Sequence, residues 1–228
     1  MNNQMIEQFL RSLQTARGLN GDQIDAIGND VRASFLPMII ERSAGKEMAW
    51  DPISRLSKDR NIFIVTPIND TVAFSVMAQL LVLDAIDSSN DITIYIMSPG
   101  GQVTSGLAIH DTMKLVKCDV RTIGIGHCES MGAFLLTSGT KGKRLVTPSW
   151  RGMIHQPLGG AGGQVTDVEI HANEMKRLKE ILTRYMAEYV GRSYDEVHLA
   201  CERDNFMSPE EAVQFGLVDG ILKFPEKK

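Results

Sequence analysis

Residues 120–136 read VRTIGIGHCESMGAFLL and hold the signals of a strand, a tight turn and a helix within one short stretch. Apolar residues alternate with others over 120–126, which is typical of a half-buried strand. The apolar run that begins at Met131 predicts a buried helix. Ser130 lies at the junction, where a tight turn would hold its hydroxyl beside the N–H groups of a helix N-terminus. Acyl transfer needs both parts, a fixed nucleophile and donors for a developing oxyanion.

Strand and helix patterns alternate on both sides of this junction. The expected strands are 61–67, 91–97 and 120–126, and the expected helices are 73–86, 103–116 and 131 to about 139. Further short strands are expected within 144–154. Such alternation favours parallel strands joined by crossover helices, so the predicted fold class is α/β.

A long helix is predicted over 167–189. Two rows of residues recur in it every seven positions: Val168, Met175, Leu182 and Tyr189, and His171, Leu178 and Tyr185. Such a stripe most often faces the core of its own domain, but it is also the seam of a helix that pairs with another helix. Because this helix follows a glycine-rich tract at 158–163, we expect it to project, and to support self-association as well as packing.

The two ends of the chain predict different units. Residues 1–33 suggest a helical extension, which is either packed on the body, a removable leader or a docking element. Residues 34–228 are expected to form one domain, with the projecting helix at about 164–190. Near its end, Ser208 has the sequence of a helix N-cap with a capping box, and Gly216 is a plausible end of that helix.

The composition excludes several classes of protein. Apolar residues make up 43 % of the 228, enough for a substantial core, and a net charge of −4 argues against a nucleic-acid or anionic-membrane partner. No apolar run reaches the roughly 18 residues of a membrane span, and the N-terminus lacks the pattern of a secretory signal. Cys118, Cys128 and Cys201 have no metal-ligand spacing, and their sparse, odd number favours a reducing cytoplasm.

A serine nucleophile needs a base, and the chain has five histidines. His155 is the best placed, because it ends a strand-like run and precedes a glycine-rich loop. The other four are weaker candidates: His110 is expected at the surface beside Asp111, His127 is too near the serine in sequence, and His171 and His198 lie on later helices. Asp204 at a turn could orient the base, although spacing alone does not select it from 28 acidic residues.

A second source of oxyanion donors follows the strand at 91–97. Gly100 and Gly101 allow a close backbone approach and positive φ, so one of their N–H groups could act together with the Met131 amide. By itself a Gly-Gly pair after a strand is also an ordinary tight turn. The loop does not fit the glycine-rich patterns that bind phosphates.

The chain resembles the proteolytic subunits of the Clp protease, the ClpP family. The matching motifs are Ser98-Pro99-Gly100-Gly101, Ser130-Met131-Gly132-Ala133-Phe134-Leu135-Leu136, Lys141-Gly142-Lys143-Arg144, Met153-Ile154-His155-Gln156-Pro157-Leu158-Gly159-Gly160 and Arg203-Asp204-Asn205-Phe206. Their order and spacing agree, and the similarity extends from about Phe35 to Leu222.

The resemblance implies a crotonase-like fold of repeated β/α units with a projecting long helix. It implies a Ser-His-Asp triad, which falls on Ser130, His155 and Asp204, and an oxyanion hole at Gly100 or Gly101 and the Met131 amide. It further implies heptameric rings stacked as a tetradecamer that cleaves unfolded polypeptides inside a chamber. An ATP-driven unfoldase ring is the implied partner, and it is the unfoldase that uses ATP, so no cofactor or metal is implied for this chain.

The sequence also departs from the family pattern. Cys128 and Glu129 replace small apolar residues before the serine, and Met97 replaces an asparagine. Glu129 leaves open a catalytically impaired ring subunit with an assembly role. Three more hypotheses are weaker: Cys128 as a thiol nucleophile, an acyl-CoA enzyme of the same fold, and a membrane-anchored Ser-Lys peptidase. If 1–33 is a leader, its self-cleavage is expected near Ala33-Ser34-Phe35.

Overall fold

The computed structural model describes residues 38–43 and 46–226. The chain divides into two compact units, Met1–Lys58 and Asp59–Lys228. In the described part of the first unit, β1 (Ile39–Ser43) and β2 (Lys46–Trp50) form an antiparallel hairpin that is followed by α3 (Pro52–Lys58). The expected extension at 1–33 lies outside the described residues.

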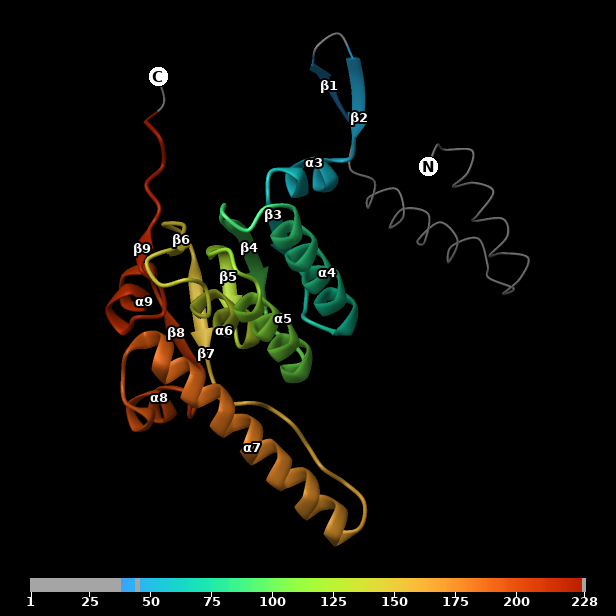
Figure 1. The fold of residues 1–228 in the computed structure, drawn as a ribbon. Helices are drawn as coiled ribbons and strands as arrows, with labels where there is room; N and C mark the ends of the chain where they lie inside the picture. The colour runs from blue at the N-terminus through green and yellow to red at the C-terminus, as the bar shows by residue number, and fades with distance from the viewer. Residues whose placement is uncertain (1–37, 44–45, 227–228) are drawn as a thin grey trace, which may run out of the picture. The chain divides into compact units, whose positions relative to one another are not determined.

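The second unit contains the predicted alternation of strands and helices (Figure 1). Its elements are β3 (Asn61–Ile64), α4 (Asp70–Ile86), β4 (Ile92–Ser98), α5 (Val103–Leu115), β5 (Val120–Glu129), α6 (Met131–Thr137), β6 (Arg144–Val146), β7 (Arg151–Ile154), α7 (Val165–Val190), α8 (Tyr194–Ala200), β8 (Asn205–Met207), α9 (Pro209–Phe215) and β9 (Gly220–Ile221). Strands pair in the order β3-β4-β5-β6-β9, all parallel, and this confirms the α/β class.

β5 is longer than the alternation pattern predicts, and it changes partner along its length. Its first half pairs with β6, with Gly124 opposite Val146, and its second half pairs with β7. Gly126, at φ 65°, lies between the two halves, and the register with β4 also shifts there. A glycine at positive φ permits this kind of local irregularity, which re-aims the strand end. As a result, the end of β5 that leads to Ser130 lies against β7.

The core of the second unit is a layer of aliphatic side chains between the sheet and its helices. The largest fully buried side chains are Trp150, Phe134, Ile62, Ile64, Ile68, Leu80, Ile92, Ile94, Ile96, Ile109, Leu135 and Leu136. The isoleucines of β3 and β4 supply much of this layer, and α4, α5 and α6 contribute the rest. Burying each such side chain contributes roughly 1.5–3 kcal/mol, which fixes the sheet that carries the site.

Arg144 of β6 ties the ends of two helices to the sheet. Its side chain is 3 % exposed and pairs with Asp219 at 2.6 Å. One guanidinium nitrogen also donates to the carbonyl of Thr137 at 3.2 Å and to that of Tyr189 at 3.0 Å. These carbonyls lie in the last turns of α6 and α7, where helices have no internal donors left. Arg144 therefore anchors the C-terminal end of α7 beside the end of α6.

α7 projects from the body of the second unit, as predicted (Figure 1). Only Thr183, Met186 and Ala187 are buried along its 26 residues, and all three lie in its C-terminal half. The segment that follows β7 runs outward beside this helix (Figure 1). The contact of Gly159 with Met175 shows that the two lie side by side. Gly191 at φ 71° ends the helix. Self-association through the outer half stays a prediction.

Two shorter helices begin as capping boxes. Ser208 and Glu211 form the one predicted at the start of α9, and Ser193 and Glu196 form a second at the start of α8. Gly216 ends α9 at φ 96°, also as predicted. Across the ranges that the structure describes, no helix combines the length and the apolar character that a bilayer span requires.

Candidate active site

Ser130 occupies a strained position at the turn between β5 and α6. Its backbone has φ 51° and ψ −122°, a region that non-glycine residues rarely adopt. The turn is held on both sides: the Ser130 N–H donates to the Met153 carbonyl at 2.8 Å, and the Ser130 carbonyl accepts from Phe134 at 3.0 Å. Such strain costs of order 1–3 kcal/mol and is common at functional sites. The geometry presents the hydroxyl at the start of a helix, as the sequence predicted.

His155 and Asp204 come together through the pairing of β7 with β8. His155 follows the last residue of β7, and Asp204 precedes the first residue of β8; Ile154 lies opposite Asn205 in this antiparallel pair. The His155 Nδ1 lies 2.9 Å from the Asp204 Oδ1. The His155 side chain is 10 % exposed, whereas that of Asp204 is 63 % exposed. The carboxylate therefore holds the imidazole from its solvent side.

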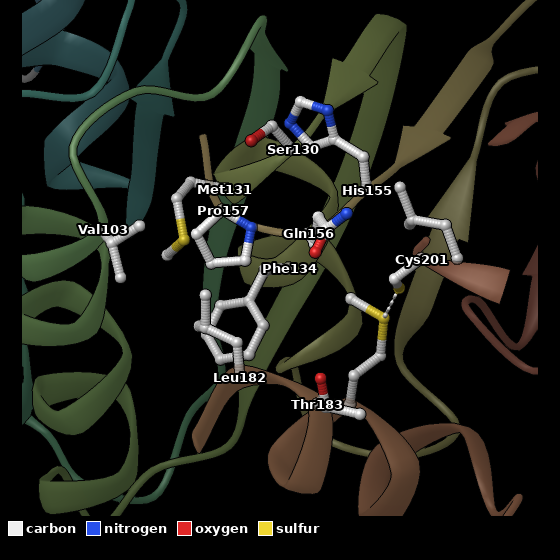
Figure 2. Close-up of a pocket in the computed structure, with 12 residues that line it drawn as sticks. Val103, Ser130, Met131, Phe134, His155, Gln156, Pro157, Leu182, Thr183 and Cys201 are labelled. Carbon is white, nitrogen blue, oxygen red and sulfur yellow. Dashed lines mark hydrogen bonds between the residues drawn. The ribbon is translucent and has the colours of Figure 1, made fainter. Parts of the chain in front are cut away.

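Ser130 and His155 line the same pocket (Figure 2). Figure 2 shows the serine side chain and the imidazole ring next to each other at one end of it. Within the described residues, the Ser130 hydroxyl makes no hydrogen bond with the imidazole. Catalytic hydrogen bonds are often long or poorly aligned without substrate, so the spacing is compatible with a nucleophile and its base.

The glycine loop at 98–101 lies against the serine turn. A Cβ on Gly100 would lie 2.7 Å from the Ser130 Cβ and 2.8 Å from the Met131 nitrogen, so only a glycine fits there. The Gly100 N–H donates to the Ser98 Oγ at 3.1 Å. In the described part of the chain, the N–H groups of Gly101 and Met131 have no hydrogen-bond acceptor. Of the two glycines, Gly101 therefore retains the donor that an oxyanion hole requires.

The pocket beside Ser130 is mainly apolar. Its walls come from α5, α6, α7 and the end of α8, through Val103, Met131, Phe134, Leu182, Met186 and Cys201. Thr183 also lines it, but its hydroxyl already donates to the Lys179 carbonyl at 2.8 Å. An apolar side chain of a substrate fits such a lining. The apolar helical spacing of these wall residues is visible in the sequence, but the pocket that they form beside Ser130 was not predicted from it.

The remaining histidines do not line this pocket. The expectation that His110 is exposed is wrong: its side chain is 2 % exposed and lies between the Asp111 carboxylate, at 2.8 Å, and the Tyr189 hydroxyl, at 2.6 Å. Burial lowers the pKa of His110 below its usual range. His171 is exposed on α7, and His198 stacks on Tyr194. These positions favour His155 as the base.

Cys128 and Glu129 have different surroundings. Cys128 is fully buried, its thiol donates to the Ile96 carbonyl, and burial raises its pKa to about 12, which argues against a thiol nucleophile. Glu129 is half-buried, next to Ser130 in the chain. Among the described residues its carboxylate makes no hydrogen bond or ion pair.

A serine on a strained strand-to-helix turn, an imidazole–carboxylate pair and two unpaired amides are parts that a hydrolase using acyl transfer requires. The family model for the Clp protease matches residues 44–224, and the chain belongs to the Clp protease family. This establishes the ClpP-type fold and a Clp-type peptidase. In general, members of this family assemble into an oligomeric ring and work with an unfoldase partner.

Proposed function

We propose that this chain is the serine endopeptidase subunit of an ATP-dependent protease of the cytoplasm. Ser130 attacks the scissile carbonyl while His155 accepts the hydroxyl proton and then returns it to the leaving amine. Asp204 holds the His155 tautomer and stabilises the imidazolium. The Gly101 and Met131 amides hold the developing oxyanion. Water then attacks the acyl-enzyme by the same route in reverse.

The contact between His155 and Asp204 carries this proposal. An imidazole held by a carboxylate at 2.9 Å has one nitrogen committed to the acid and the other available for proton transfer. That ring lines the pocket in which Ser130 lies at a helix N-terminus. Ser130 and His155 thus line one pocket, and Asp204 contacts the imidazole, which supports the order of action that a triad needs.

The surroundings of the site support the proposed substrates and assembly. The apolar pocket suits an apolar side chain on the acyl side of the cleaved bond. Folded proteins keep such side chains buried, so unfolded chains are the proposed substrates. We propose heptameric rings stacked as a tetradecamer through the projecting α7, with an ATP-driven unfoldase ring feeding the chamber. Entry to the chamber, rather than the pocket alone, then selects what is cut.

A second candidate is a catalytically impaired ring subunit with an assembly role. Two observations favour it: an unpaired Glu129 lies next to the nucleophile in the chain, and the Ser130 hydroxyl makes no hydrogen bond with His155 within the described residues. A negative charge near the serine would oppose formation of an oxyanion. In this case the fold and the rings would persist without hydrolysis.

Hydrolysis of fluorogenic peptides with an apolar residue before the cleaved bond separates the two candidates. The proposed peptidase predicts turnover by the wild-type assembly and loss of at least about 10³-fold in kcat for Ser130→Ala and for His155→Ala. Native mass spectrometry of the same samples reports the stoichiometry of the rings. Assembled wild-type rings without turnover, matched by an equally inactive Ser130→Ala, would favour the impaired subunit.

A further inference from the structure

Trp150 is the largest of the fully buried side chains, and it lies at the step from β6 to β7. Two glycines make room for its indole. A Cβ on Gly152 would lie 2.1 Å from the indole Cη2, and a Cβ on Gly124 would lie 2.7 Å from the indole Nε1. Gly124 belongs to β5 and Gly152 to β7, so one side chain fills space that both strands leave open.

These two strands carry the proposed nucleophile and base. β5 ends at Glu129, directly before Ser130, and β7 ends at Ile154, directly before His155. They pair in parallel over only a few residues, with Cys128 opposite Gly152 and Glu129 opposite Met153. One further bond, from the Ser130 N–H to the Met153 carbonyl, closes the pair at its end. Such a short ladder depends on side-chain packing for its spacing.

The indole acts through its volume. Its Nε1 has no hydrogen-bond partner among the described residues, although a buried tryptophan usually finds one. Burial raises the pKa of the Cys128 thiol and the indole opposes that rise, but a thiol is a weak hydrogen-bond partner, so removing the ring acts mainly through its lost volume. Loss of the ring would leave a cavity bounded by two residues that have no side chains to fill it.

We propose that Trp150 is a positioning residue, a wedge that sets the spacing of β5 and β7 and thereby brings Ser130 within reach of His155. This inference rests on the proposed function, because it concerns the same reaction. It assigns to Trp150, Gly124 and Gly152 a joint role that none of them has alone. Without the wedge, the strands close into the cavity and the serine moves relative to the imidazole.

The test compares kcat, KM and the rate at which a fluorophosphonate labels Ser130, all measured on assembled particles. For Trp150→Ala we expect kcat and the labelling rate to fall by at least about tenfold, because a shift of roughly 1 Å at the reacting atoms has effects of this size or larger. KM should stay within about twofold, since most of the pocket wall comes from α5, α6, α7 and the end of α8, and only Ile154 of β7 contributes to it among the described residues. Leu80→Ala in α4 is the matched core control, and there kcat should be nearly unchanged.

A reciprocal pair of variants separates positioning from general destabilisation. The side chain of Gly152→Val points at the indole, so this variant alone should lower kcat. Combined with Trp150→Ala, the valine should refill the cavity and restore kcat to within about threefold of wild type. If Trp150→Ala does not assemble, the milder variant Trp150→Phe is compared with the wild type. For Trp150→Phe we expect kcat to fall by about threefold or more.

Three results would overturn the wedge: wild-type labelling rates in assembled Trp150→Ala or Trp150→Phe, an equal loss of kcat in Leu80→Ala, or no recovery in the double variant. Failure of the proposed function gives a different result, because wild-type particles would then neither hydrolyse peptide nor take up the phosphonate.

Discussion

Replacing Asp204 by asparagine isolates the contribution of one negative charge to the proposed reaction. The asparagine side chain keeps the size of the carboxylate and can still accept a hydrogen bond from the His155 Nδ1, which lies 2.9 Å from the Asp204 Oδ1. What it removes is the charge that stabilises the imidazolium in the transition state. A hydrogen bond to a charged group contributes roughly 1.5–3 kcal/mol, and the exposure of Asp204 favours the lower part of that range.

A loss of about 1.5–2 kcal/mol corresponds to a decrease in kcat of roughly 10- to 30-fold, since each 1.4 kcal/mol is a factor of ten. Because the charge acts on the transition state and not on the bound peptide, KM should change little. Steady-state hydrolysis of a fluorogenic peptide measures both constants. Glu202→Gln is the matched control: Glu202 is a nearby exposed acid that pairs with Lys179, so its loss should leave kcat within about twofold.

Three results would refute this reasoning. A kcat for Asp204→Asn equal to that of the wild type would show that the carboxylate does not assist the imidazole during turnover. A loss as large as that of Ser130→Ala would show that Asp204 does more than stabilise charge from the solvent side. An effect shared with Glu202→Gln would mean that the net charge of the surface matters instead.

Three further changes probe the neighbourhood of the site. Gly101 has φ 149°, and Gly101→Ala places a methyl group against the Ile68 carbonyl, so the loop must shift. The kcat should then fall by about 10²-fold with a smaller change in KM, and an unchanged kcat would exclude the Gly101 amide as an oxyanion donor. Native protein at about pH 8 should not react with iodoacetamide at Cys128, because burial raises its pKa to about 12, and peptide mapping that finds rapid alkylation would contradict the buried position. Burial lowers the pKa of His110 below the ordinary histidine value of about 6.5, so the folded protein binds this proton less readily than the unfolded chain does. The folded state is therefore favoured above about pH 6.5, and this contribution to stability is lost as the pH falls below that value. His110→Phe should therefore reduce the fall in melting temperature between about pH 7 and pH 5, and an unchanged slope would contradict the role of this residue.

Local patterns predicted the elements that depend on local chemistry. The alternating residues of 120–126 and the apolar helices on either side gave the α/β class, and the Ser208 capping box marked the start of α9. Each of these signals comes from neighbouring residues and from the period of a helix or a strand. The projecting helix was predictable for the same reason, since its seven-residue repeat does not depend on distant parts of the chain.

Contacts between distant residues were harder to predict from residue patterns alone. Asp204 reaches His155 because β8 pairs with β7, and no spacing in the sequence encodes that register. His110 looked exposed because its partner, Tyr189, lies on a helix far along the chain. Trp150 was not identified because one of the glycines that make room for it, Gly124, lies far away in the sequence on β5.

β5, the strand that leads to Ser130, shows the same limit on a smaller scale. Alternation ended at Gly126, and the prediction ended with it, but β5 continues to Glu129 by pairing with a different strand. The positive φ of Gly126 permits the continuation, and only the fold shows that β7 is there to receive it. The hairpin of β1 and β2 was likewise not predicted, because residues 34–60 have no clear periodicity.

Mapping of a fluorophosphonate adduct on the intact, assembled protein tests the central claim most directly. Such a probe forms a stable bond only with a serine whose hydroxyl a nearby base activates and whose oxyanion is stabilised. We predict a single adduct, on Ser130, that is absent in Ser130→Ala and greatly slowed in His155→Ala. A folded, assembled particle that takes up no probe, or takes it up on another residue, would contradict the account.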